Sequence, residues 1–141
     1  MIRFFDTSAF VKRYVEEPGS TMVRTALRSH AVVVARVTLA ETAAAIARAA
    51  RAGVLTEAQR NIILERLPED FAKLQVIEIR PALVFRVPAL VVRHPLRAYD
   101  AIQLAAASAI RQKGFAVEMW CADGDLSAAA IADGFRVVVP V

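Results

Sequence analysis

Short runs of β-branched and aromatic residues alternate along the chain with longer segments in which apolar side chains recur every three or four positions. The runs predict buried strands at 2–5, 31–35, 76–79, 117–122 and 135–139. The longer segments predict amphipathic helices at 9–16, 20–29, 38–52, 81–92, 98–113 and 125–132. Strands that alternate with helices in this way are typical of an α/β domain, with a central, mostly parallel sheet flanked by helices.

One further helix is predicted from the residues at its ends. Thr56 and Gln59 have the spacing of a capping box, in which each side chain bonds the backbone N–H of the other residue. Pro68 is expected to end or kink this helix, because proline has no N–H to donate inside a helix. For the same reason, Pro88 is a weak point in the segment 81–92.

The composition favours one domain and excludes several classes of protein. A length of 141 residues suits a single domain, which we expect to span 1–141. Because 57% of the residues are apolar, the chain can fill a core, and the surplus is expected to be covered by a partner or a second copy. No apolar stretch approaches the ~18 residues of a membrane span. The single cysteine, Cys121, excludes an internal disulfide and fits a reducing cytoplasm.

The chain has a moderate excess of positive charge. It contains 18 lysine and arginine residues against 14 acidic ones, a formal net charge of +4. Such an excess serves solubility, and it also suits a polyanionic partner. If several of the acids belong to one site, the rest of the surface is more basic still, as an enzyme that acts on nucleic acid requires.

Acidic residues follow three of the predicted strands. Asp6 comes directly after the first strand, Glu41 lies in the first turn of the helix after the second, and Asp123 follows the fourth. Asp125 comes two residues later. Ligands of an open α/β sheet bind beyond the carboxyl ends of its strands. If the strands are parallel, these acids therefore lie at the edge of the sheet where ligands bind.

Each of these acids also has a purely structural interpretation. Asp6 or Ser8 can cap the first helix, and Asp123 can cap the helix that follows it. Thr38 and Glu41 have capping-box spacing. Acids that converge, however, repel: two like charges 4 Å apart cost about 1 kcal/mol in water and about 4 kcal/mol at an effective dielectric of 20. A converging cluster needs either raised pKa values or a cation, and its oxygen ligands suit Mg²⁺ or Mn²⁺.

Four motifs occur in a fixed order: Asp6-Thr7-Ser8, Thr38-Leu39-Ala40-Glu41, Tyr99-Asp100-Ala101-Ile102-Gln103-Leu104-Ala105 and Cys121-Ala122-Asp123-Gly124-Asp125-Leu126. With them, the chain resembles the PIN-domain nucleases from end to end, and within that family the VapC toxins of toxin–antitoxin pairs. The segment Glu17-Pro18-Gly19-Ser20 after the first helix is also common in such toxins. One departure is Cys121, where the family commonly has threonine or serine.

The resemblance implies a single PIN domain with an acidic catalytic site at four positions of this chain: Asp6, Glu41, Asp100 and Asp123. It is the resemblance, and not the strand pattern, that adds Asp100 to the other three acids. A Mg²⁺ or Mn²⁺ ion would be bound mainly by Asp6, Asp100 and Asp123. Glu41 would orient a water molecule or complete the metal shell.

The resemblance also implies auxiliary residues around this site. Asp125 matches a position that is acidic in some members of the family. Thr7 or Ser8 matches a hydroxyl that orients the first carboxylate or a bound water. Arg48 is a candidate from helical geometry, because it lies seven residues after Glu41 and so on nearly the same helix face. It could hold a neighbouring phosphate of the substrate, and the alternative is an ordinary solvated arginine.

The resemblance implies a metal-dependent endoribonuclease that acts as the toxin of a toxin–antitoxin pair in the cytoplasm. Its partners would be an RNA substrate, a VapB-like antitoxin and a second copy in a homodimer. Three alternatives stay open. The chain could be a PIN-domain RNA-processing nuclease without an antitoxin, a metal-binding or phosphoryl-transfer module with the same acidic pocket, or an interaction domain whose acids only cap helices.

Overall fold

The computed structural model describes residues 1–29 and 31–141, which contain one sheet of five strands. In chain order these are β1 (Ile2–Phe5), β2 (Val32–Ala35), β3 (Gln75–Ile77), β4 (Val117–Trp120) and β5 (Arg136–Val138). Across the sheet the order is β3-β2-β1-β4-β5, and every neighbouring pair is parallel. The predicted α/β class is therefore confirmed, and the sheet is wholly parallel.

The order of the strands places a crevice next to β1. From β1 the chain moves outward through β2 to β3, and it then crosses back to the other side of β1 to form β4 and β5. Phe5, the last residue of β1, is paired with Val34 on one side and with Trp120 on the other. In open parallel sheets the carboxyl ends of the two strands at such a reversal border the place where ligands bind.

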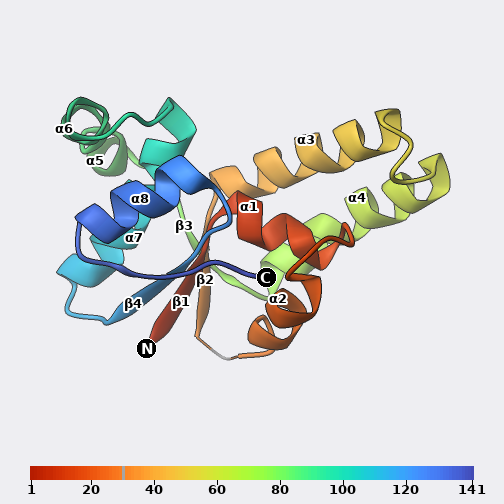
Figure 1. The fold of residues 1–141 in the computed structure, drawn as a ribbon, viewed down its shortest axis with the longest axis horizontal. Helices are drawn as coiled ribbons and strands as arrows, with labels where there is room; N and C mark the ends of the chain where they lie inside the picture. Colours follow the sequence, from red (N-terminus) through yellow and green to blue (C-terminus); the bar gives the residue numbers. More distant parts are fainter. Residues whose placement is uncertain (30) are drawn as a thin grey trace.

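Helices cover both faces of the sheet (Figure 1). On one face lie α5 (Pro81–Val84), α6 (Val87–Arg93), α7 (Ala98–Gln112) and α8 (Gly124–Ala132). On the other lie α1 (Thr7–Phe10), the 3₁₀ helix η1 (Val11–Arg13), α2 (Ser20–Ala26) and the C-terminal half of α4 (Glu57–Ala72). Successive strand residues point to opposite faces, so Phe4 packs in the first layer and Phe5 in the second. Burial on both faces explains why the strands are continuous apolar runs.

The helices α3 (Val37–Arg51) and α4 form a hairpin that extends beyond the sheet (Figure 1). The predicted capping box begins α4: Thr56 Oγ1 accepts from the Gln59 N–H at 3.1 Å, and Gln59 Oε1 accepts from the Thr56 N–H at 2.9 Å. Of the two outcomes expected at Pro68, an end or a kink, the first is wrong, because α4 continues to Ala72.

Tertiary contacts hold α4 together beyond Pro68. Phe71 is buried and meets Phe10 edge-on, with the ring centroids 5.4 Å apart. Asp70 accepts a hydrogen bond from the Tyr14 hydroxyl at 2.5 Å and forms an ion pair with Arg13 at 3.1 Å. These contacts lie on the face of the sheet that α1, α2 and α4 cover. They stabilise the helix by more than the loss of the one backbone hydrogen bond that the proline cannot make.

Two other predicted helices differ from the structure. The segment 9–16 instead begins at Thr7, as α1, and ends in η1 at Arg13. The segment 81–92 is divided into α5 and α6, but the division falls at Phe85 and Arg86 and not at Pro88. Pro88 is tolerated in the first turn of α6 because the first N–H groups of a helix have no partner within it. In the described part of the chain, none of the helices combines the length and the apolar character of a membrane span.

Replacing Pro68 with alanine should stabilise the protein by about 1–2 kcal/mol, because it restores an N–H inside α4 and relieves the clash of the ring with the preceding turn. The free energy of unfolding from urea titration measures this change. Glu69→Ala, at the exposed neighbouring position, is the control and should change stability by less than about 0.5 kcal/mol. A loss of stability in Pro68→Ala would show that α4 depends on the rigidity of the proline.

Candidate active site

A cavity of about 720 Å³ at the carboxyl end of β1 and β4 brings together the acidic residues that the sequence singled out: Asp6, Glu41, Asp100, Asp123 and Asp125. Its lining also includes Thr7, Ser8, Arg48, Arg97, Tyr99 and Gln103. The five acids come from four places in the chain, namely the end of β1, α3, the start of α7 and the start of α8 after β4. Strand-end acids therefore do share this edge of the sheet.

Asp6 is both the cap of α1 and a wall of the cavity. Its Oδ1 accepts from the Ala9 N–H at 3.0 Å, and both of its carboxylate oxygens lie 2.8 Å from Ser8 Oγ. The side chain is almost fully buried. Burial outweighs these hydrogen bonds and raises the pKa of Asp6 to about 6. A neighbouring positive charge would lower it again.

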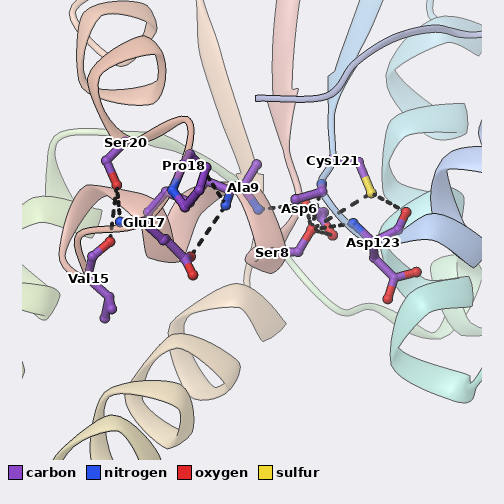
Figure 2. Close-up of polar contacts among 11 residues, drawn as sticks. Asp6, Ser8, Ala9, Val15, Glu17, Pro18, Ser20, Cys121 and Asp123 are labelled. Atoms are coloured by element: carbon purple, nitrogen blue, oxygen red, sulfur yellow. Dashed lines mark hydrogen bonds and ion pairs between the residues drawn. The ribbon is translucent and has the colours of Figure 1, made fainter. Parts of the chain in front are cut away.

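The hydroxyl of Ser8 joins the ends of the two central strands. It accepts hydrogen bonds from the backbone N–H groups of Ala122 at 2.8 Å and Asp123 at 3.0 Å, and its own proton is directed to Asp6. Figure 2 shows Asp6, Ser8, Cys121 and Asp123 gathered at this junction. Of the two hydroxyls proposed from the resemblance, Ser8 is the one that contacts the first carboxylate, whereas Thr7 points to Glu41.

Asp123, like Asp6, both caps a helix and lines the cavity. It is the N-cap of α8, and its Oδ1 accepts from the Leu126 N–H at 2.9 Å. Its backbone carbonyl faces Cys121 Sγ at 3.4 Å. Burial, together with the negative charge of Asp6, raises the pKa of the Cys121 thiol to about 12, so Cys121 stays protonated and does not act as a nucleophile.

The pKa of Asp100 is raised by its surroundings in the cavity. The residue lies in the first turn of α7 and is partly buried. Burial raises its pKa, and the negative charges of Asp123 and Glu41 raise it further, against a smaller lowering by Arg97. The acids are thus close enough to repel one another through the cavity.

Glu41 is held differently from the way that the sequence suggested. The expected capping box of Thr38 and Glu41 is wrong: α3 begins at Val37, one residue before Thr38, and no side chain caps it. Glu41 is therefore not needed at the helix end, and its Oε1 instead accepts from Thr7 Oγ1 at 2.7 Å and from Gln103 Nε2 at 3.1 Å. These bonds turn Glu41 toward α1 and α7.

Two arginines border the acids. Arg48, on the helix face shared with Glu41, lines the cavity and is exposed. Arg97, in the loop before α7, also lines the cavity and is exposed. Tyr99 and Gln103 lie in the third sequence motif, but neither they nor Arg97 has a role predicted from the sequence. The signal for Gln103 was its position three residues after Asp100, because residues three apart share a helix face.

The donors around the cavity fit a hard divalent cation. They are carboxylate and hydroxyl oxygens, which Mg²⁺ and Mn²⁺ prefer. In residues 1–29 and 31–141, no group of three or more acidic, histidine or cysteine side chains lies close enough together to hold a metal ion. Mg²⁺ characteristically uses one or two carboxylates and keeps several waters. A partly preformed set of acids whose mutual repulsion a cation relieves therefore suits such an ion.

The raised pKa of Asp6 predicts a pH-dependent effect of Asp6→Asn in EDTA. Between about pH 4 and pH 6 the folded protein binds the extra proton, so its stability falls as the pH rises through this range. Asparagine removes that loss and should add about 2–3 kcal/mol of stability at about pH 7.5, but little at about pH 4. Denaturant titration at both pH values measures this, with the exposed Asp125→Asn as control. Destabilisation of Asp6→Asn at the higher pH would contradict the prediction.

Comparison with known proteins shows the family to which the chain belongs. The PIN domain family matches residues 3–131. Ribonuclease VapC45 and ribonuclease VapC49, both from Mycobacterium tuberculosis, are each 36% identical to the chain over 136 residues, which covers 95% of this chain and 92% of each relative.

Solved structures show the same fold at lower identity. A toxin–antitoxin complex from Klebsiella pneumoniae matches with a TM-score of 0.67 and 20% identity, over 99% of this chain and 98% of the other. Mycobacterium tuberculosis VapC20, a sarcin-ricin loop cleaving toxin, matches with a TM-score of 0.66 and 21% identity, over 99% and 98%. With the family match over most of its length and the VapC ribonucleases as relatives, the chain belongs to the PIN domain family.

Proposed function

We propose that this protein is a divalent-metal-dependent endoribonuclease and the toxin of a toxin–antitoxin pair. One observation carries the proposal: five acids from four places in the chain line one cavity beside exposed arginines, at the strand reversal where α/β sheets bind ligands. The full-length similarity to proteins named ribonucleases supports the choice of RNA as the substrate. We propose the whole of 1–141 as the functional domain, because β5, which follows the matched region, completes the sheet.

The proposed ligands of Mg²⁺ or Mn²⁺ are Asp6, Asp100 and Asp123. When bound, such an ion polarises the phosphate and lowers the pKa of a bound water. Asp6 is preorganised for this role by Ser8 and by the first turn of α1, and Asp123 by its cap bond to α8. Asp125, exposed at the rim, is an auxiliary acid.

Other residues of the cavity bind and orient the substrate in this proposal. Glu41 completes the metal shell or orients the attacking water in line with the phosphate. Arg48 and Arg97 pair with phosphates on either side of the scissile bond, outside the carboxylates. Tyr99 is 58% exposed at the start of α7, and its ring offers a stacking surface to an unpaired base.

We propose two protein partners. A VapB-like antitoxin is supported by the similarity in fold to a toxin–antitoxin complex. A homodimer is supported by exposed apolar side chains on α6 and in the turn before it, since Phe85 is 81% and Val92 is 88% exposed. Such side chains cost free energy in water unless a partner covers them.

Cleavage mapping on total RNA tests the proposed activity. The wild type should cut in Mg²⁺ or Mn²⁺ and stop cutting in EDTA. Asp6→Asn and Asp100→Asn should each reduce the rate by at least about 100-fold, because each removes a proposed carboxylate ligand of the metal ion. Glu69→Gln removes an exposed acid outside the cavity and is the matched control. Equal cleavage by all four proteins would mean a contaminating nuclease or a wrong assignment.

Arg48→Ala should weaken RNA binding with little change in kcat, because the side chain contacts a phosphate away from the reacting one. The slope of log affinity against log salt concentration should become shallower by about 0.7, the contribution of one phosphate contact in single-stranded nucleic acid. Filter binding over a range of salt concentrations measures both. Arg51→Ala, on the same helix but outside the cavity lining, is the control. An unchanged slope would make Arg48 an ordinary solvated arginine.

A further inference from the structure

Gln103 lies at the centre of a buried polar network that ties three helices to the site. Only 1% of its surface is exposed. Its Nε2 is 2.8 Å from Thr38 Oγ1, 3.1 Å from Thr7 Oγ1 and 3.1 Å from Glu41 Oε1. One amide on α7 thus reaches α1 and two residues of α3.

The partners of this amide fix its orientation. A carboxylate only accepts hydrogen bonds, so the group that faces Glu41 Oε1 must be the NH₂ side of Gln103. Thr7 Oγ1 donates to the same Oε1 at 2.7 Å. Both donors therefore bind one oxygen of Glu41, and among the described residues no donor reaches the other, Oε2.

The same orientation leaves a polar atom of Gln103 unsatisfied. Its carbonyl Oε1 is buried and has no hydrogen-bond partner in the described part of the chain. An unpaired buried carbonyl destabilises a folded protein, and an apolar side chain of similar length would avoid that penalty. The glutamine is therefore better explained by what its NH₂ group holds than by the stability of the core.

We propose that Gln103 is a positioning residue that fixes Glu41 Oε1 and so presents Oε2 to the cavity. An amide can do this without adding charge, whereas a lysine would occupy the place of a cation and a glutamate would repel Glu41. The consequence for metal and substrate rests on the proposed function, while the contact between Gln103 and Glu41 does not.

Two substitutions separate this role from a structural one. Gln103→Met keeps the length and removes the hydrogen bonds, and Gln103→Glu keeps the shape and adds a like charge. Gln112→Met is the matched control, because Gln112 lies on the same helix but bonds Arg86 outside the cavity. Each protein is tested for its Mn²⁺ dissociation constant by calorimetry, for kcat and KM on RNA, and for unfolding in EDTA.

We expect Gln103→Met to weaken Mn²⁺ binding and to lower kcat by about 10-fold each, as is usual when a residue that orients a metal ligand is lost. KM should stay unchanged, and stability in EDTA should be equal or higher. Gln103→Glu should have larger effects on binding and kcat, and Gln112→Met should have none. Values of the dissociation constant and kcat for Gln103→Met within twofold of the wild type would overturn the proposal.

A double-mutant cycle shows whether Gln103 acts through Glu41. In the Glu41→Gln background, Gln103→Met should cause no further loss of Mn²⁺ affinity or kcat, because the group that it positions is already changed. Additive losses would overturn the proposal.

A metal-free measurement separates failure of this inference from failure of the proposed function. In EDTA, the side-chain amide NMR signals of Gln103 should be protected from exchange and should move in Glu41→Gln, but stay in place in Asp125→Asn. If the wild type neither binds Mn²⁺ nor cuts RNA, the proposed function fails and the amide signals still decide the contact. Amide signals of Gln103 that stay in place in Glu41→Gln would overturn the inference.

Discussion

Repulsion among carboxylates is the interaction on which the rest of the site depends. The parallel sheet carries Asp6 and Asp123 to neighbouring strand ends, and α7 adds Asp100 to the same cavity. Burial raises the pKa of Asp100, and the negative charges of Asp123 and Glu41 raise it further, which is where this repulsion is visible. A fold that held these side chains only for stability would spread them out, since one acid caps one helix equally well anywhere. A cation bound among them, as we propose, would relieve this crowding.

The local structure offsets part of this repulsion by giving the acids a second use. Asp6 caps α1 and Asp123 caps α8, so each negative charge lies at the positive end of a helix and accepts a backbone hydrogen bond. The choice between a cap and a site residue is thus a false one for these two positions. Glu41 is the exception, because α3 begins without a side-chain cap and leaves Glu41 to Thr7 and Gln103.

Sequence periodicity was enough to predict the sheet, and strand ends were enough to predict that Asp6 and Asp123 share an edge, because both follow from local pattern and parallel topology. Asp100 required the family resemblance, since it begins a helix and follows no strand. The continuation of α4 past Pro68 depends on contacts with Phe10 and Tyr14, more than fifty residues earlier, which no local pattern contains. The position of Gln103 three residues after Asp100 is visible in the sequence, but its role is not, because that role exists only once three helices meet.

The hydroxyl of Ser8 spans a sequence separation of 114 residues to reach the backbone N–H of Ala122. β1 also gains its second neighbouring strand in the sheet only when β4 has formed. During translation, the first acid therefore emerges long before the strand that completes its surroundings. A growing chain holds no assembled pocket until β4 has left the ribosome, so the order of synthesis itself delays the chemistry to the last stage of folding.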